Sequence, residues 1–276
     1  MRSCGVTIAS NKLRQFAEEP DATIVGIPPL PLRRIQTPRY TLIVTSPYSA
    51  QTMTSAVRTT GDELDATIEE VRATLRQLQC VANVWQIGPS CRPEGLTQRL
   101  IERGFRPVAR TPYEHRMAVM AMEQRPAVPS AVTSVRTAMV SSFDEYVLAL
   151  RVAMEAFSVS EEDAAGWMVA APALWESQDG TTRFTHLAYL DDEPVGFGFS
   201  QACDAGVMLS GSGVLAAARG RGVYRALVGA RWAAAERLRA PGLCVHAGVM
   251  SRPILERCGF EFVCELALYE DVSFSS

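Results

Sequence analysis

The segment that most constrains the fold is Arg219-Gly220-Arg221-Gly222, which joins an apolar run at residues 207–214 to a long amphipathic run at residues 223–238. The apolar run is typical of a buried strand, and the spacing of the second run predicts a helix. Glycine adopts the backbone conformations that a sharp turn requires. The segment therefore predicts a strand, a tight turn and a helix, with successive N–H groups pointing outward where the helix begins.

Such a helix start is suited to an anion, because its first N–H groups lack acceptors and lie at the positive end of the helix dipole. Arg219, Arg221 and Arg225 add positive charge to the same place. We expect a phosphate or pyrophosphate as ligand. The alternative is that these residues form only a flexible polar loop. The spacing excludes a dinucleotide loop of the GxGxxG type and a GxxxxGK[ST] loop.

The length of 276 residues favours two domains, since single cores rarely grow beyond about 250–300 residues. Residues 122–130 carry Pro126 and Pro129 and interrupt every hydrophobic periodicity around them, as an exposed linker does. We place the boundary there. The predicted domains are residues 1–127 and 128–276.

Each predicted domain mixes helices and strands. Upstream of the boundary the patterns predict strands at 40–45, 81–87 and 108–120 and helices at 63–78 and 94–103. Downstream they predict helices at 141–157 and 161–171, a hairpin at 185–190 and 195–199, a strand at 207–214, a helix at 223–238, a strand at 243–247, a helix at 253–257 and a strand at 262–269. This order predicts an α+β fold, with a mixed central sheet flanked by helices.

Composition excludes several classes of partner. The net charge is −3, without a block of like charges, so we expect no nucleic acid partner. The apolar runs are far shorter than the roughly 18–20 residues that a membrane helix needs, so we expect no membrane partner. The first residues lack the apolar core of an export signal, so we expect a cytoplasmic location. The seven cysteines show no paired spacing, so we expect neither a disulfide framework nor a metal site.

The turn resembles the acyl-CoA pyrophosphate loop of the GNAT superfamily, whose pattern is Arg or Gln, two residues, Gly, one residue, then Gly or Ala. Arg219 and Gly222 agree with this pattern, whereas Tyr224 departs from it. The tyrosine side chain must therefore point away from the phosphates or cover them. The resemblance implies that acyl-CoA is held by the following residues: Val214, Leu215, Arg219, Gly220, Arg221, Gly222, Val223, Tyr224 and Ser251.

In the family, the strand residue five positions before the arginine pairs its backbone with the pantetheine arm, and Val214 takes that place. The glycines before it fit a bulge that opens the strand edge, although an ordinary twisted strand fits equally. A second resemblance is the strand at 243–247, the following helix and the closing Gly259-Phe260. Ser251 replaces the usual asparagine, and Leu255 replaces the tyrosine that often acts as general acid.

The N-terminal half resembles the same fold more weakly, through a helix that ends at Gly104-Phe105 and a final strand. It lacks the Arg-x-x-Gly loop before its helix at 63–78, where Asp62 would present a carboxylate to a phosphate. The resemblance therefore implies tandem GNAT-like domains. Residues 1–127 would be a degenerate, non-catalytic repeat and residues 128–276 the acyl-CoA-binding catalytic domain.

The implied activity is transfer of an acetyl or other acyl group from acetyl-CoA to a primary amine of a small molecule or peptide, without a metal, by a monomer or homodimer. His246 is the candidate base, because its ordinary pKa lies near neutrality. The alternative is a half-buried histidine bonded to a backbone carbonyl. Tyr224 is the second catalytic candidate, near the thioester sulfur. The alternatives are a non-catalytic sensor of acyl-CoA and a pure interaction scaffold.

Overall fold

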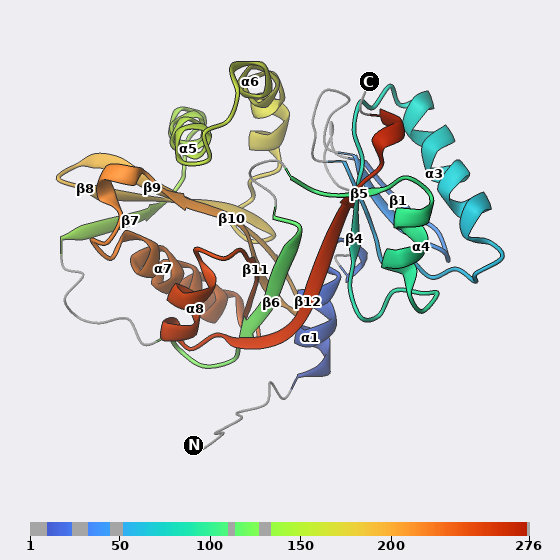
Figure 1. Cartoon of the computed structure of the whole chain (residues 1–276). Coiled ribbons are helices and arrows are strands. Elements are labelled where there is room, and N and C mark those ends of the chain that lie inside the picture. The colour runs from blue at the N-terminus through green and yellow to red at the C-terminus, as the bar shows by residue number, and fades with distance from the viewer. Residues whose placement is uncertain (1–9, 24–32, 45–51, 110–113, 127–133, 275–276) are drawn as a thin grey trace. The chain divides into compact units, whose positions relative to one another are not determined.

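The computed structural model describes residues 10–23, 33–44, 52–109, 114–126 and 134–274 (Figure 1). Two compact units emerge, and neither is a continuous half of the sequence. Unit 1 comprises residues 1–24, 118–158 and 178–264, and unit 2 comprises residues 25–117, 159–177 and 265–276. The expected boundary between residues 127 and 128 lies outside the described residues, and each unit takes segments from both sides of it.

The sheet of unit 1 has the strand order β6-β11-β10-β9-β8-β7. Only the pair β10 and β11 is parallel, and the other neighbours are antiparallel. The strands are β6 (Arg116–Met122, in unit 1 from Ala118), β7 (Val135–Met139), β8 (Arg183–Leu190), β9 (Glu193–Cys203), β10 (Gly206–Val214) and β11 (Leu243–Ala247). The helices are α1 (Asn11–Glu18), α2 (Pro20–Thr23), α5 (Phe143–Ala156), α7 (Val223–Leu238) and α8 (Arg252–Cys258).

Helices α5 and α7 cover opposite faces of this sheet. Gly196 and Gly198 of β9 face α7, because a Cβ on either would meet side chains of that helix. Gly213 of β10 faces the other way, because its Cβ would lie 3.0 Å from Ala156 of α5. Alternation along the strands therefore divides the unit into two apolar layers. The larger cluster on the α7 side includes Phe184, Val207, Val228, Trp232, Leu243, Val245, Leu255 and Phe260.

The sheet of unit 2 has the strand order β1-β2-β3-β4-β12, and β5 also pairs with β12. Here β3 and β4 are parallel, and the other pairs are antiparallel. The strands are β1 (Arg33–Gln36), β2 (Thr41–Val44), β3 (Met53–Ser55), β4 (Val84–Ile87), β5 (Arg106–Pro107) and β12 (Glu261–Glu270, in unit 2 from Glu265). The helices are α3 (Leu64–Gln77), α4 (Leu96–Glu102) and α6 (Glu161–Glu176). Trp85 and Phe105 meet edge to face in its core.

The two units repeat one order: antiparallel strands, a helix, a parallel strand and a further helix. The last strand of each run is exchanged, since β6 pairs with β11 in unit 1, and the unit 2 part of β12 pairs with β4. The expected α+β fold with mixed sheets is confirmed. The strand expected at 108–120 is wrong in its start, because β6 begins at Arg116 and residues 110–113 lie outside the description.

Candidate acyl-CoA site

The loop between β10 and α7 is a sequence of tight turns. A short 3₁₀ turn, Ala216–Ala218, follows β10, and Arg219 is extended. Gly220 (φ 77°) and Gly222 (φ 84°) then adopt the left-handed conformation, which costs a residue with a Cβ about 1–2 kcal/mol. Gly222 is the N-cap of α7. The two glycines therefore turn the chain directly from strand to helix, as the sequence predicts.

Six consecutive backbone amides in this loop have no acceptor. Within the described residues, the N–H groups of residues 220–225 donate to no carbonyl and to no side chain. The first bonded amide is that of Ala226, which donates to the Gly222 carbonyl at 3.0 Å. These donors lie at the positive end of a helix of 16 residues. The arrangement fits an oxyanion with several acceptor atoms, such as a diphosphate.

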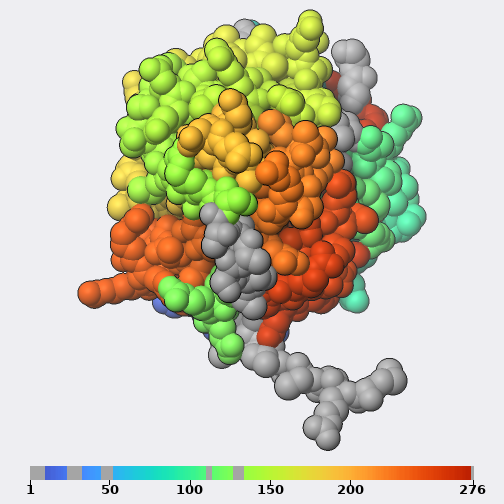
Figure 2. Space-filling view, turned by 90° about the vertical axis from the view of Figure 1, so that its left-hand side faces the viewer, coloured from blue at the N-terminus to red at the C-terminus, as the bar shows by residue number. Residues whose placement is uncertain are grey.

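The arginines around the amides are engaged differently. Arg219 donates from Nε to the Val214 carbonyl at 3.2 Å, which fixes the loop to the end of β10. Arg221 lies 3.6 Å from Asp191 in the turn between β8 and β9, and both side chains are exposed. On the face drawn in Figure 2, orange atoms of this part of the chain reach the surface beside gold atoms of that turn. The guanidinium of Arg221 is therefore exposed, and Asp191 would compete with an anionic ligand for it.

Strands β10 and β11 stay paired over only two positions. Val207 pairs with Leu243 and Met208 with Cys244, and the register between β9 and β10 shifts immediately afterwards. Beyond this point β10 pairs with β9 alone, as far as Val214. The Leu215 amide donates to Val195 of β9 at 2.9 Å, so by alternation the Val214 amide points to the side away from β9. The edge expected to pair with a pantetheine arm is therefore unpaired in the described structure.

Most apolar residues of the predicted site are buried beneath the loop, between the sheet and α7. Val214 and Val223 are buried in one cluster with Leu227, on the α7 face of the sheet. A Cβ on Gly196 would lie 2.8 Å from Val223, so the start of α7 packs directly on β9. Leu215 is half-buried and contributes its amide to the ladder. The structure thus brings the predicted residues from Val214 to Tyr224 together in one continuous turn.

Tyr224 points inward instead of over the amides. Its ring packs against the apolar clusters beneath the loop. Burial raises the pKa of this phenol, and Arg231 partly opposes the rise. The phenol is therefore a hydrogen-bonding group at neutral pH. Of the two positions the sequence left open for this ring, the structure shows the one that points away from the amides.

His246 is bonded to α1. Its Nε2 lies 2.7 Å from the Ala17 carbonyl, and because a carbonyl only accepts, Nε2 carries the proton. Burial lowers the pKa of His246 to about 4 despite this hydrogen bond. This is the structural contact that the sequence left open as an alternative to catalysis. Ser251 precedes α8 and donates to the Gly248 carbonyl at 3.3 Å, so it does not cap that helix.

Sequence reasoning missed Arg231 and Ser212. The guanidinium of Arg231 is fully buried, and its Nη1 donates to the Ser212 hydroxyl at 2.6 Å. Arginine on an amphipathic helix is usually exposed, so helical spacing gave no signal of burial. A signal does exist in the strand across from it, because Gly198 leaves the space that the guanidinium fills.

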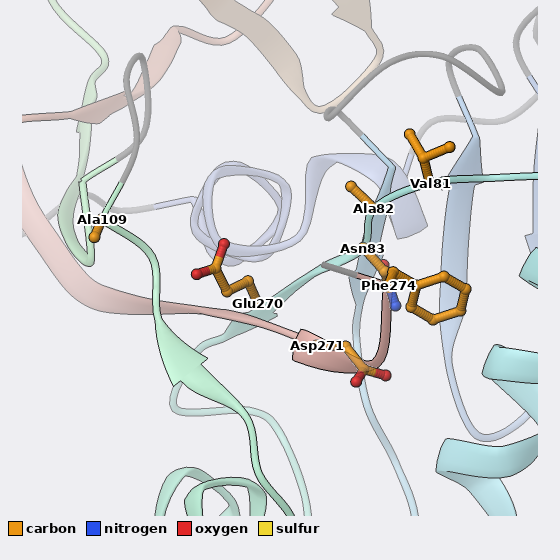
Figure 3. A pocket seen from close by; sticks show the side chains of 7 residues that line it. All are labelled: Val81, Ala82, Asn83, Ala109, Glu270, Asp271 and Phe274. Carbon is orange, nitrogen blue, oxygen red and sulfur yellow. The ribbon is translucent and has the colours of Figure 1, made fainter. Parts of the chain in front are cut away.

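Unit 2 has a pocket of about 400 Å³ near the end of β12, but its polar groups are committed to the fold. Asp271 forms an ion pair with Arg72, and the Asn83 amide bonds to Thr54. In Figure 3 the carboxylates of Glu270 and Asp271 point in different directions and do not converge on the pocket. The pocket is lined by Val81, Ala82, Asn83, Ala109, Glu270, Asp271 and Phe274.

The described residues contain no cluster of three or more His, Cys, Asp or Glu that could hold a metal ion. None of the helices in the described part of the chain is long and apolar enough to span a membrane.

Comparison with known proteins places the fold. No family model matches the chain, and no curated protein matches it. Among solved structures, a GCN5-related N-acetyltransferase from Kribbella flavida matches with a TM-score of 0.69 and 18% identity over 96% of both chains. A GCN5-related N-acetyltransferase from Sphaerobacter thermophilus matches with a TM-score of 0.59 and 18% identity, over 84% of this chain and 80% of that one.

A tandem GNAT protein from the clavulanic acid biosynthesis pathway matches with a TM-score of 0.55 and 12% identity, over 94% of this chain and 87% of that one. These identities are low, so the likeness concerns the fold. The expected resemblance is confirmed at that level. The chain shares its fold with these GNAT structures.

Proposed function

We propose that this chain is an N-acetyltransferase that binds acetyl-CoA in unit 1 and transfers the acetyl group to a primary amine of a small molecule or peptide. The observation that carries the proposal is the row of unpartnered amides from Gly220 to Arg225, next to an unpaired edge of β10. The amides would hold the diphosphate, and the Val214 amide would pair with the pantetheine arm. Residues 128–276 would form the catalytic part, completed by α1 and β6, and act in the cytoplasm.

The proposed reaction is direct transfer. The amine nitrogen forms a bond to the acyl carbon, the carbon–sulfur bond breaks, and one proton passes from the nitrogen to the thiolate. Tyr224 is the candidate proton donor, because burial raises the pKa of its hydroxyl and so keeps the proton on it at neutral pH. His246 has only Nδ1 left as an acceptor, and its pKa of about 4 makes it a weak base at neutral pH.

A second candidate function is a non-catalytic module that binds acyl-CoA. It is favoured by the absence of a neutral-pKa base among the predicted catalytic residues, since His246 is bonded to Ala17 and Tyr224 is largely buried. Leu255, at the position of the usual tyrosine, is fully buried and apolar. Both functions require the same CoA site, so they differ only in turnover.

Thermal unfolding with and without CoA tests the shared requirement. A ligand at about 100 times its dissociation constant stabilises the folded state by about 2.7 kcal/mol, so Tm should rise by several degrees. No rise with either CoA or acetyl-CoA would refute both functions. A rise followed by CoA release with any member of a panel of small amines, aminoglycosides, amino acids and peptides supports the enzyme. A rise without release across that panel supports the binding module.

A further inference from the structure

Arg231 is a buried charge without a carboxylate. Its residue exposure is 0%, and within the described part of the chain no acid pairs with it. Burial lowers the pKa of Arg231 to about 10, so the guanidinium remains protonated at neutral pH. Burying an unpaired charge costs several kcal/mol, and an apolar residue would fill the same space without that cost. A residue of this kind is expected to have a specific role.

The guanidinium is held between a helix and three strands. Its Nε donates to the Leu227 carbonyl of its own helix at 3.1 Å. Its Cζ lies 2.9 Å from the position of a Cβ on Gly198, so the group sits directly on β9. His186 of β8 and Ser212 of β10 are the two cross-strand neighbours of Gly198. The guanidinium therefore lies over the middle strand, with a polar side chain on each side.

Its hydrogen bonds are directed to one side only. Nη1 donates to Ser212 at 2.6 Å, whereas Nη2 is buried without a partner among the described residues. The Nδ1 atom of His186 is likewise buried with no partner in the described part of the chain. The Ser212 hydroxyl thus joins Arg231, in the middle of α7, directly to β10.

Ser212 lies on the part of β10 beyond the register shift, where β9 is its only strand neighbour among the described residues. Arg231 lies on the helix whose start carries the row of unpartnered amides. The bond between Arg231 and Ser212 therefore ties the unpaired strand edge to the helix that carries the amide row. Acyl-CoA would have to bind both at once, with its diphosphate on the amides and its pantetheine arm on the strand.

We infer that Arg231 is a positioning residue of the acyl-CoA site, which through Ser212 holds the free edge of β10 at a fixed distance from the amides at the start of α7. This inference rests on the proposed function. It predicts that loss of Arg231 weakens binding of a ligand that occupies both the amides and the strand edge more than binding of a ligand that occupies the amides alone. If Arg231 only stabilised the fold, its loss would weaken binding of both ligands equally or of neither.

Calorimetric titration with two ligands separates these cases. One ligand is CoA, and the other is 3′-phosphoadenosine 5′-diphosphate, which has the nucleotide and diphosphate but lacks the pantetheine arm. Arg231→Met keeps the length of the side chain and removes the charge. We expect it to weaken CoA binding by about tenfold, the loss expected for one charge-assisted hydrogen bond, and to leave binding of the shorter ligand within about twofold.

Ser212→Ala removes the same hydrogen bond with a smaller change in the side chain, so it tests the inference even if Arg231→Met does not fold. It should weaken binding of CoA and leave binding of the shorter ligand unchanged. Arg237→Met is the control, because Arg237 is an exposed arginine of the same helix. It should change neither affinity.

Three outcomes would overturn the inference. They are equal weakening of both ligands, unchanged CoA affinity in the folded variants, or the same selective loss in Arg237→Met. Failure of the proposed function has a different signature, because the unmodified protein itself would then bind neither ligand.

Discussion

Helices α7 and α3 begin at corresponding points of the two units, each after a strand that pairs in parallel with the strand following the helix. The start of α7 leaves six consecutive amides without acceptors in the described part of the chain. Before α3, by contrast, the chain supplies acceptors for two of the amides, those of Thr60 and Glu63. The Thr60 amide and hydroxyl donate to the Glu63 carboxylate, and the Glu63 amide donates to the Thr60 hydroxyl at 3.3 Å. A carboxylate therefore lies at the start of α3, whereas the first turn of α7 contains no acidic residue.

The strand edges differ in the same way. Beyond their two parallel pairs, β10 and β11 form no further bridge among the described residues. Beyond the two pairs of β3 and β4, the chain is bridged again through Arg92. The Arg92 amide donates to Val57 at 2.8 Å, and the Thr59 amide donates to Arg92 at 3.4 Å. One topology can therefore leave backbone groups for a ligand or satisfy them internally. We expect CoA to bind unit 1 alone.

The largest effect should come from Gly222→Asp, which gives the start of α7 the carboxylate that α3 already has. Repulsion of the diphosphate should weaken CoA binding by about 100-fold or more in calorimetric titration. The left-handed backbone also costs stability on its own. Gly95→Asp controls for that strain, because Gly95 is an exposed left-handed N-cap of α4. If both variants lose CoA equally, or neither does, the comparison fails.

The next largest effect concerns stability and tests the structural role of unit 2. Arg72 of α3 binds both carboxylate oxygens of Asp271, at 2.8 and 3.0 Å, and so ties the end of the exchanged strand β12 to this helix. The hydrogen bonds that Arg72 donates to Asp271 raise the pKa of Arg72. Arg72→Met should leave a buried carboxylate unpaired and cost about 3 kcal/mol in urea unfolding. CoA affinity at low temperature should not change.

Arg76→Met is the control for that prediction, because Arg76 is an exposed arginine of the same helix whose nearest acid, Glu69, is equally exposed. A loss of CoA affinity in folded Arg72→Met would show that unit 2 takes part in binding.

Acid should act mainly on unit 1, which contains His186 and His246. Burial lowers the pKa of each to about 4, below the ordinary value of 6.5. Between these values the unfolded chain binds protons that the folded chain does not, so stability should fall as pH falls from about 6.5 to 4. In chemical unfolding followed against pH, His246→Gln should reduce this slope. The opposite result would be an unchanged dependence of stability on pH together with loss of an inflection near neutral pH in the rate of CoA release. That result would make His246 the base.

A smaller effect should follow the loss of the carboxylate before α3. Hydrogen bonds from Thr60 lower the pKa of Glu63, so its contribution to stability is present above the unfolded pKa, near 4.5, and is lost as pH falls through the folded value. Glu63→Gln should therefore lower Tm slightly at pH 7 and not at pH 2–3. Asp62→Asn, which changes a neighbouring acid, should not reproduce this pattern. A gain of CoA binding in unit 2 would contradict the account, because the Thr59 amide remains bonded to Arg92.

The smallest effect is expected at Asp191, which pairs with Arg221 of the loop. Asp191→Asn should release Arg221 and tighten CoA binding by about two- to threefold at low salt, with no gain at high salt, because exposed ion pairs are weak and screened. Asp192→Asn is matched to it, since Asp192 has a similar left-handed backbone and pairs with Arg136 instead. Equal effects from the two variants would show that only the net charge matters.

The parts of this fold that depend on local sequence were predictable. The helix expected at 223–238 matches α7 at both ends, because glycines precede it and its apolar spacing is regular. The third strand of the second half differs from β10 by one residue. The loop itself followed from Arg-Gly-Arg-Gly, since only glycine adopts both left-handed positions easily.

The parts that depend on partners distant in sequence were not predictable. The exchange of β6 and β12 leaves no local signal, since an apolar strand pairs equally well with either sheet. The burial of Arg231 depends on the space above Gly198, 33 positions earlier in the sequence, and the contact between His246 and α1 joins residues 229 apart. Likewise, the sequence predicted the carboxylate before α3 at Asp62, whereas Thr60 bonds to that of Glu63, and the bridge through Arg92 left no signal in the sequence.

Hydrogen exchange measured by mass spectrometry, with and without CoA, tests the central claim most directly. Peptides that cover residues 220–225 should exchange rapidly without ligand and become protected when CoA binds. Peptides that cover residues 57–63 should show the same exchange in both conditions. CoA binding without protection of residues 220–225, or with protection of residues 57–63 instead, would contradict the assignment of the diphosphate to the start of α7.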